Sequence, residues 1–237
     1  GIVRWEHQNA PEAFAFLRDA AHRGAHSMAD ELGLPRSKAV TTIKPSGTLS
    51  KVMDTTEGVH RPLGRYLFNN VQFSEHDPIV SLLERSGYRV FEHPFDGTSK
   101  LVTFPVAYDD VVFDVVDDKH VNLEPAVSQL ERYKLLMDHY VDHNCSITVS
   151  YDPHEIPAIV EWLDRNWDHY VGVSFILRND PTKTAKDLGY PYLPQEVVTD
   201  KQYLEYVNQL QSVDVDSANS LEELSSGECA SGACPVR

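Results

Sequence analysis

The sequence has few cysteines, no long apolar run and fewer basic than acidic residues. Three cysteines in 237 residues are too few for a disulfide-stapled scaffold. No apolar run approaches the roughly 18 residues of a membrane span, and the first residues lack the basic start and apolar stretch of a secretory signal. We therefore predict a cytoplasmic protein with no membrane partner.

The charge balance narrows the class of ligand. Lys and Arg number 21 against 36 Asp and Glu, which gives a formal net charge of −15. Such a surface repels nucleic-acid polymers, and we expect none as a partner. A small phosphate ligand stays compatible, because backbone amides can hold it locally. The apolar content of 41% is typical of a globular protein with a real core.

Hydrophobic periodicity predicts alternating helices and strands. Helices are expected over residues 9–32, 77–87, 122–140, from 152 onward and 200–209. Strands are expected over residues 39–43, 66–73, 101–104, 146–149 and 171–177. The order strand, helix, strand over residues 146–177 predicts a parallel crossover, and the apolar run 171–177 predicts a strand buried on both faces. The fold class is therefore α/β.

The composition changes toward the carboxyl end. From residue 212 onward Ser, Asp, Glu, Ala and Gly predominate, and such a segment cannot bury enough apolar surface to fold. We predict two regions: a folded part over residues 1–195, and an acidic, largely flexible tail over residues 196–237. We also expect the chain to be the carboxy-terminal piece of a longer protein.

A candidate phosphate-binding loop follows the strand expected at residues 39–43. The stretch 46–50, Ser-Gly-Thr-Leu-Ser, offers three hydroxyls, and Gly47 allows close backbone approach. Unpaired amides at the start of a following helix would add the positive end of its dipole, and Lys44 could add charge. The alternative is an ordinary Ser/Thr helix cap. His60 and Arg65 follow closely, and we expect them to line the same cleft.

The sequence ends with two cysteines five residues apart, Cys229 and Cys234, in a stretch of small residues. A loop this short gains little stability from a disulfide, and structural zinc needs four ligands. A dithiol on a mobile arm is suited to thiol–disulfide exchange. The 26 residues from Ser212 span about 30 Å as a flexible chain. The alternative is two unrelated cysteines at a disordered end.

Other polar and aromatic residues have structural interpretations. Cys145 at a strand start is typical of a small core residue. His139 and His143 are spaced for a metal pair, but a solvated helix face is the usual setting, and we predict no metal site. Trp162 and Trp167 are expected to pack in the core.

Two segments resemble a known family. Residues 41–50, Thr-Thr-Ile-Lys-Pro-Ser-Gly-Thr-Leu-Ser, and 57–60, Glu-Gly-Val-His, resemble the adenosylcobalamin-dependent (class II) ribonucleotide reductases. The Cys229 and Cys234 ending is similar to that of the monomeric ribonucleoside-triphosphate reductase type.

This resemblance implies a fold, a reaction and roles for particular residues. The fold is the carboxy-terminal portion of a ten-stranded α/β barrel followed by a flexible tail. The reaction converts ribonucleoside triphosphates to deoxyribonucleotides by thiyl-radical chemistry with adenosylcobalamin. The tail dithiol re-reduces the active site and is recharged by a thioredoxin-like protein, and the whole enzyme is a monomer. The residues implied to hold the substrate phosphates are Ser46, Gly47, Thr48, Leu49 and Ser50, and those implied as the redox shuttle are Cys229 and Cys234.

The sequence also departs from this pattern. The radical cysteine and its partners are expected upstream of Gly1, so this chain alone is expected to be inactive. Asn69 and Asn70 stand where basic residues are expected in the family. The alternative to a reductase is a non-catalytic, phosphate-binding α/β module with a redox-sensing tail.

Overall fold

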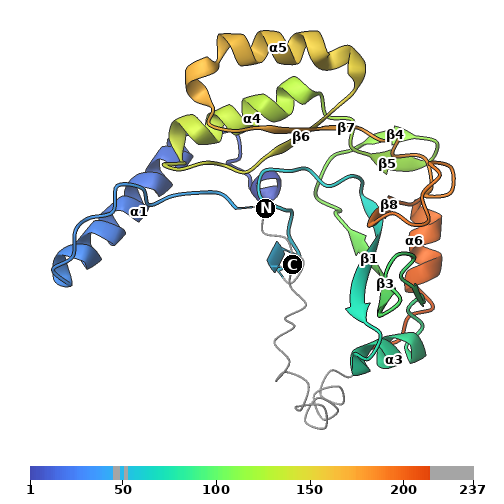
Figure 1. Ribbon diagram of the computed structural model, residues 1–237. Coiled ribbons are helices and arrows are strands. Elements are labelled where there is room, and N and C mark those ends of the chain that lie inside the picture. Colours follow the sequence, from blue (N-terminus) through green and yellow to red (C-terminus); the bar gives the residue numbers. More distant parts are fainter. Residues whose placement is uncertain (45–48, 51–52, 214–237) are drawn as a thin grey trace. The chain divides into compact units, whose positions relative to one another are not determined.

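The computed structural model describes residues 1–44, 49–50 and 53–213 (Figure 1). The chain forms two compact units, each assembled from two separate stretches of sequence. The first comprises residues 1–62 and 122–179, and the second comprises residues 63–121 and the described residues from 180 onward. The boundary predicted after residue 195 stays a prediction. No helix among the described residues is long and apolar enough to cross a membrane.

The first unit is mainly helical and contains one parallel pair of strands. Its elements in chain order are η1 (Ile2–Arg4), α1 (Pro11–Glu31), α4 (Ala126–His139), β6 (Thr148–Tyr151), η2 (Pro153–Glu155), α5 (Ile156–Arg165), η3 (Trp167–His169) and β7 (Ser174–Leu177). Strands β6 and β7 pair in parallel, with Thr148 opposite Ser174. Because α5 connects them, the predicted crossover is confirmed.

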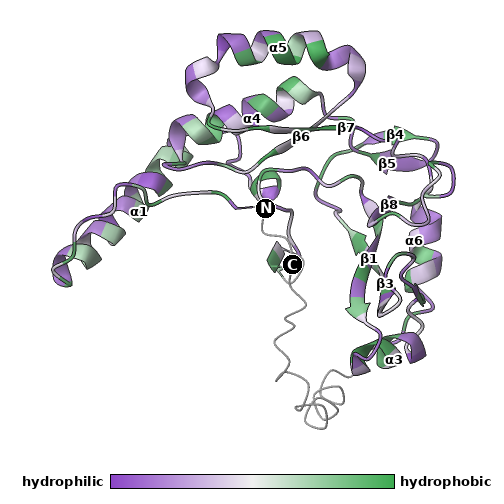
Figure 2. Cartoon of the chain, in the orientation of Figure 1, coloured by the Kyte–Doolittle hydropathy of each residue, from purple (hydrophilic) through white to green (hydrophobic). Residues whose placement is uncertain are grey.

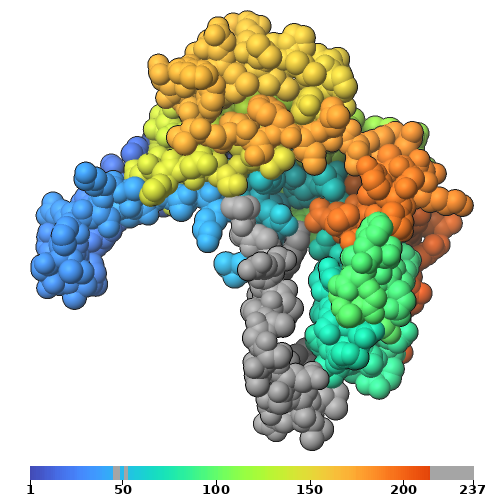
Figure 3. Space-filling view, in the orientation of Figure 1, coloured from blue at the N-terminus to red at the C-terminus, as the bar shows by residue number. Residues whose placement is uncertain are grey.

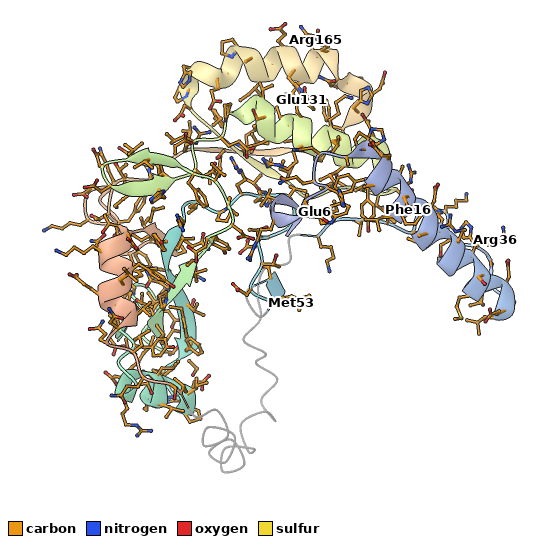
Figure 4. All side chains as sticks on the ribbon, turned by 180° about the vertical axis from the view of Figure 1, so that it is seen from behind. Glu6, Phe16, Arg36, Met53, Glu131 and Arg165 are labelled. Atoms are coloured by element: carbon orange, nitrogen blue, oxygen red, sulfur yellow. The ribbon has the colours of Figure 1, made fainter. Side chains whose placement is uncertain are left out.

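Helix α4 provides the centre of the first unit's core. Leu130, Tyr133 and Leu136 recur at helical spacing along one face and are fully buried. Helix α5 lies over α4 (Figures 1 and 4), and the Nε1 of Trp162 donates to Oε1 of Glu131 over 2.6 Å. The indole is thus buried with its only polar group satisfied. Trp162 is a core residue as predicted.

Helix α1 confirms the predicted helix, and Phe14 is its one buried residue. Phe14 is buried and its ring meets those of Trp5 and Tyr140, whereas Leu17 and Met28 are exposed. The later turns of the helix extend away from α4 (Figures 1 and 3) and mix polar and apolar residues (Figure 2). These turns bond instead to the segment after the helix, where Arg36 donates to Asp30 at 2.6 and 2.9 Å, and their large apolar side chains stay exposed.

Strand β7 also differs from its prediction. All four of its residues are exposed, rather than buried on both faces. Strand β6 is its only strand neighbour among the described residues, because the sheet here contains two strands. A fully apolar sequence predicts burial only when a second layer is present to cover it.

The second unit is built on an antiparallel sheet. Its elements in chain order are β1 (Tyr66–Ser74), α3 (Pro78–Arg85), β2 (Val90–Glu92), β3 (Ser99–Ala107), β4 (Asp114–Val116), β5 (Lys119–Val121), β8 (Gln195–Val197) and α6 (Asp200–Val207). Four strands form a sheet in the order β2-β3-β1-β8, and β4 pairs with β5 separately. Long strands β1 and β3 pair along their whole length, with Val71 opposite Val102.

Local caps explain the predicted helix ends in this unit. The side chain of Asp77 accepts from the amide of Ile79 at the start of α3. Gly87 follows the helix with a φ of +91°, a conformation that favours glycine. Thr199 and Gln202 form a reciprocal capping box at the start of α6. Strand β8 was not predicted, because three residues are too few to show a periodicity.

Candidate functional site

The predicted site residues lie mostly outside the described part of the chain. Ser46, Gly47, Thr48, Cys229 and Cys234 fall outside it. Of the predicted phosphate-binding loop, Leu49 is exposed and Ser50 is buried. The structure therefore defines this candidate site through the two segments that flank the loop.

The segment before the loop is extended but is not a regular strand, which corrects the prediction for residues 39–43. It forms one isolated parallel bridge, between Ile43 and Cys145. The amide of Asp142 donates to the Thr41 carbonyl over 3.1 Å, and the Thr42 hydroxyl donates to the Asn144 carbonyl over 2.9 Å. Backbone bonds and side-chain bonds are thus mixed along this segment, and only one bridge of a regular ladder forms.

Asp142 holds this segment with its carboxylate. Its Oδ2 accepts from the amides of Val40 and Thr41 at 2.9 and 3.2 Å. From α1, Arg18 donates to Oδ1 at 2.8 Å and His22 lies 2.6 Å from Oδ2. Burial alone raises the pKa of the Asp142 carboxyl, but these hydrogen bonds outweigh it and hold the pKa well below its usual range.

The segment after the loop makes a tight turn over residues 57–60. Gly58 adopts a φ of +47°, and the fully buried Val59 accepts a hydrogen bond on its carbonyl from Arg132 over 3.1 Å. Arg132 also pairs with Glu124. The turn is therefore fastened to α4 through its backbone, and its conformation requires the glycine.

His60 attaches the same turn to β6. Its Nε2 accepts a hydrogen bond from the amide of Thr148 over 3.0 Å. This bond needs an unprotonated Nε2, which assigns the ring proton to Nδ1 in the neutral imidazole. Burial lowers the pKa of His60 below its ordinary value, in agreement with that neutral state.

A paired charge network lies where β6 and β7 end. Glu155 accepts from the amides of Ala126 at 2.7 Å and Asp152 at 2.8 Å, so one carboxylate caps two helices. Arg178 follows β7 and donates to Asp152 over 2.8 Å and to the Glu124 carbonyl over 2.7 Å. The carboxyl ends of parallel strands are the usual place for ligand sites in α/β folds. Here the charged side chains of Glu155 and Arg178 are hydrogen-bonded to the segments around the strand ends and hold those segments together.

Cys145 is a core residue, as predicted. It is fully buried and its thiol is free. Burial raises the pKa of the Cys145 thiol to about 12, so it stays protonated near neutral pH and is a poor nucleophile. Within residues 1–44, 49–50 and 53–213, no three His, Cys, Asp or Glu side chains gather as a metal site.

Two further predictions concern Arg65 and Trp167. The cleft predicted to be shared by His60 and Arg65 stays a prediction, because the two belong to different units and Arg65 pairs with Asp109 at 2.9 Å. Trp167 is 72% exposed, so the prediction that it packs in the core is wrong. The residue lies in the short η3 turn beyond α5.

Asn70 links neighbouring strands in the second unit. Its side-chain amide donates to the Leu193 carbonyl over 2.7 Å and accepts from the Thr103 hydroxyl over 2.7 Å. A basic side chain could not accept the second bond. The asparagine therefore joins β1, β3 and the segment leading to β8.

An open groove of about 660 Å³ follows one face of α4. Its charged lining residues include Arg132, Glu124, Lys134 and Asp138. Arg132 pairs with Glu124, and Lys134 lies 2.7 Å from Asp138. Since these charges already satisfy one another, we assign the groove no ligand.

Sequence reasoning missed Glu155, which caps two helices, and Asp142 and Arg132, which hold the loop's flanks. Glu155 had a readable signal, because Asp152-x-x-Glu155 has the pattern of a capping box. Asp142 and Arg132 had none, since their partners at Val40, Thr41 and Val59 lie 73 to 102 residues away in the sequence.

Comparison with solved structures identifies the fold. A crystal structure of a B12-dependent (class II) ribonucleotide reductase matches with a TM-score of 0.75 and 20% sequence identity. The match covers 90% of this chain and 28% of that one. The chain therefore has the α/β fold of part of a class II reductase. No family model matches the sequence.

Curated proteins then confirm the family resemblance inferred from the sequence. The chain is 27% identical, over 97% of its length, to the adenosylcobalamin-dependent ribonucleoside-triphosphate reductase of Levilactobacillus brevis. It is 28% identical to the reductase of the same name from Lacticaseibacillus paracasei, over 88% of its length. A probable reductase of this kind from Dictyostelium discoideum is also 28% identical, over 86%. The chain spans roughly a third or less of each of these relatives, 31%, 28% and 26% of their lengths.

Proposed function

We propose that this chain is part of a ribonucleoside-triphosphate reductase, which converts ribonucleoside triphosphates to 2′-deoxyribonucleoside triphosphates for DNA synthesis. The observation that carries the proposal is similarity to named reductases over 97% of the chain. The likeness of fold supports it independently. Because the chain matches only about a third of those proteins, its own contribution has to be argued from its residues.

The first contribution is the substrate's phosphate site. We assign the triphosphate to Ser46, Gly47, Thr48, Leu49 and Ser50, whose hydroxyls and amides suit an anion. Support comes from both flanks, since Ile43 is bridged to Cys145 and His60 to β6 within one unit. These contacts fix the chain on both sides of residues 46–50 to the same unit.

The second contribution is reducing power. Loss of the 2′ hydroxyl as water needs two electrons, which two active-site thiols supply as they become a disulfide. A thiolate from the Cys229 and Cys234 pair attacks that disulfide, the active-site thiols are regained, and the tail pair is left oxidised. A thioredoxin-like dithiol then reduces the tail pair in the same way. The spacing of the two cysteines in a stretch of small residues supports this role.

The cofactor proposed for the whole enzyme is adenosylcobalamin, as in the names of the relatives. When bound, this group supplies the radical that starts the reaction. We assign none of the described residues to the cofactor.

The barrel architecture is also proposed, with ten strands and with β6 and β7 among the late ones. Two observations support it: β6 and β7 are parallel, and β7 exposes an apolar face that a further layer would cover. We propose that the complete enzyme acts as a monomer in the cytoplasm.

Calorimetric titration of the chain with ATP and CTP tests the phosphate site. We expect binding that a Ser46→Ala/Thr48→Val double variant weakens by about tenfold, the equivalent of 1.4 kcal/mol. Ser27→Ala removes an exposed hydroxyl from α1 and serves as the control with unchanged affinity. Equal binding by the double variant and the unmodified chain would contradict the assignment.

A further inference from the structure

Two histidines lie one turn apart on α1. His22 and His26 are four residues apart on this helix, and their ring centroids are 5.4 Å apart. Both line a groove of about 490 Å³, which is formed by α1 and by Arg36 of the segment after it (Figure 4). Residues at this spacing share one face of a helix, and a histidine pair so placed is a common way for one helix to present two metal ligands.

The hydrogen bonds of the two imidazoles assign their protons. Nε2 of His22 lies 2.6 Å from Oδ2 of Asp142, and an ionised carboxylate can only accept. Nε2 of His26 lies 3.2 Å from the carbonyl oxygen of Ser37, which also can only accept. Each ring therefore carries a proton on Nε2, and in the neutral imidazole the lone pair is on Nδ1.

These contacts are of the kind that orients metal-binding histidines. Such a histidine donates its other N–H to a carboxylate or a backbone carbonyl, which fixes the ring and makes the ligating nitrogen more basic. Here Asp142 supplies the carboxylate and Ser37 the carbonyl. Neither Nδ1 atom has a hydrogen-bond partner within residues 1–44, 49–50 and 53–213. Two nitrogen lone pairs on one helix face are therefore available to a ligand.

The charged residues of the groove balance one another. Arg36 donates two hydrogen bonds to Asp30, of 2.9 and 2.6 Å. The other charged lining residues are Asp19 and Arg23, one of each sign. With both imidazoles neutral, no net positive charge in the lining opposes the approach of a cation.

We propose that His22 and His26 bind a divalent transition-metal ion through their Nδ1 atoms. Imidazole nitrogens suit Zn²⁺, Ni²⁺ and Cu²⁺. Water completes the coordination, because no third His, Cys, Asp or Glu side chain joins the pair within the described part of the chain. The ion links successive turns of α1, so its binding requires the helix and stabilises it. This site is separate from the proposed phosphate site and from the proposed cofactor.

Calorimetric titration with ZnCl₂ tests the site. The parent protein is the 237-residue chain carrying Cys229→Ser and Cys234→Ser, because a free dithiol binds the same ion. We expect His22→Gln and His26→Gln each to weaken binding by at least about tenfold, since loss of even an outer contact of a metal site costs this much. Glutamine keeps an N–H donor for the partner of either histidine but has no nitrogen lone pair.

A second histidine pair provides the matched control. His139 and His143 are also four residues apart, but α4 ends at His139, so the two do not share a helix. The His139→Gln/His143→Gln double variant should bind Zn²⁺ as the parent does. Thermal unfolding gives an independent readout: Zn²⁺ should raise the melting temperature of the parent and of this control, and not that of His26→Gln.

The outcomes decide the assignment. Weaker binding in both single variants, together with normal binding by the control pair, supports the site. Unchanged affinity in His22→Gln or in His26→Gln, an equal loss in the control pair, or no binding by the parent overturns it. None of these results bears on the proposed phosphate site or on the tail dithiol.

Discussion

The Nε2 of His60 accepts a hydrogen bond from the amide of Thr148, 88 residues further along the chain. This contact links the turn after the phosphate-binding loop to the first residue of β6. The bond exists only while the imidazole is neutral. Because the bond joins two distant segments of the first unit, the protonation state of the imidazole bears on the stability of that unit.

The pH dependence of stability follows from the lowered pKa of His60. The unfolded chain takes up this proton near pH 6.5, whereas the folded chain resists it. The contribution of His60 is therefore complete above pH 6.5 and declines as pH falls below that value. Denaturant unfolding between pH 5 and pH 8 measures it.

Two variants make this measurement specific. His60→Gln retains an acceptor for the Thr148 amide but cannot titrate, so we expect a flatter loss of stability on acidification. His7→Gln removes an exposed histidine from the same unit and should leave the dependence unchanged. If His60→Gln and the unmodified chain lose stability in the same way as pH falls, another group controls that loss.

Glu155 should contribute far more to the free energy of unfolding than its position in a short turn suggests. Substitution by Ala removes the acceptor of the Ala126 and Asp152 amides, and we expect a loss of about 2–3 kcal/mol in the free energy of unfolding. Glu161→Ala is the matched control, because Glu161 forms only an exposed pair with Arg165 on α5. Such pairs contribute about 0.3–0.5 kcal/mol. Urea unfolding of both variants measures the difference, and equal losses would contradict the double-cap role.

Cys145 should resist thiol reagents in the folded chain. Burial and a pKa raised to about 12 leave almost no thiolate at pH 8. We expect its alkylation by iodoacetamide to be at least about a hundredfold slower in buffer than in urea. Mass spectrometry of peptides resolves this site from the other two cysteines. Comparable rates in buffer and urea would mean that the segment around Cys145 opens readily.

The tail dithiol predicts a particular pattern of activity in the complete reductase. Cys229→Ser or Cys234→Ser should abolish turnover driven by a thioredoxin-like protein, because one serine stops the exchange. A small dithiol that enters the active site directly should restore most of it. Turnover assays with the two reductants measure this pattern. Full thioredoxin-driven activity in both variants would refute the shuttle.

Local chemistry made several elements predictable from sequence. The caps at Asp77 and Asp152 and the apolar spacing along α4 specify their helices without help from distant residues. The crossover from β6 to β7 followed from the order of elements, since a strand, a helix and a strand pack in only a few ways. The family resemblance was also visible in the sequence, because it rests on short contiguous segments.

Other features required the folded chain. The exposure of β7 and of Met28 depends on which neighbours are present, and no periodicity contains that information. Asp142 is bonded to Arg18, 124 residues away, and His60 to Thr148, 88 residues away, so local sequence does not contain these contacts. Most helices and the longer strands, and the chemistry proposed for the loop and the dithiol, follow from contiguous residues. The way in which the flanks of that loop are held follows only from the fold, because hydrogen bonds between distant segments form once the chain has folded.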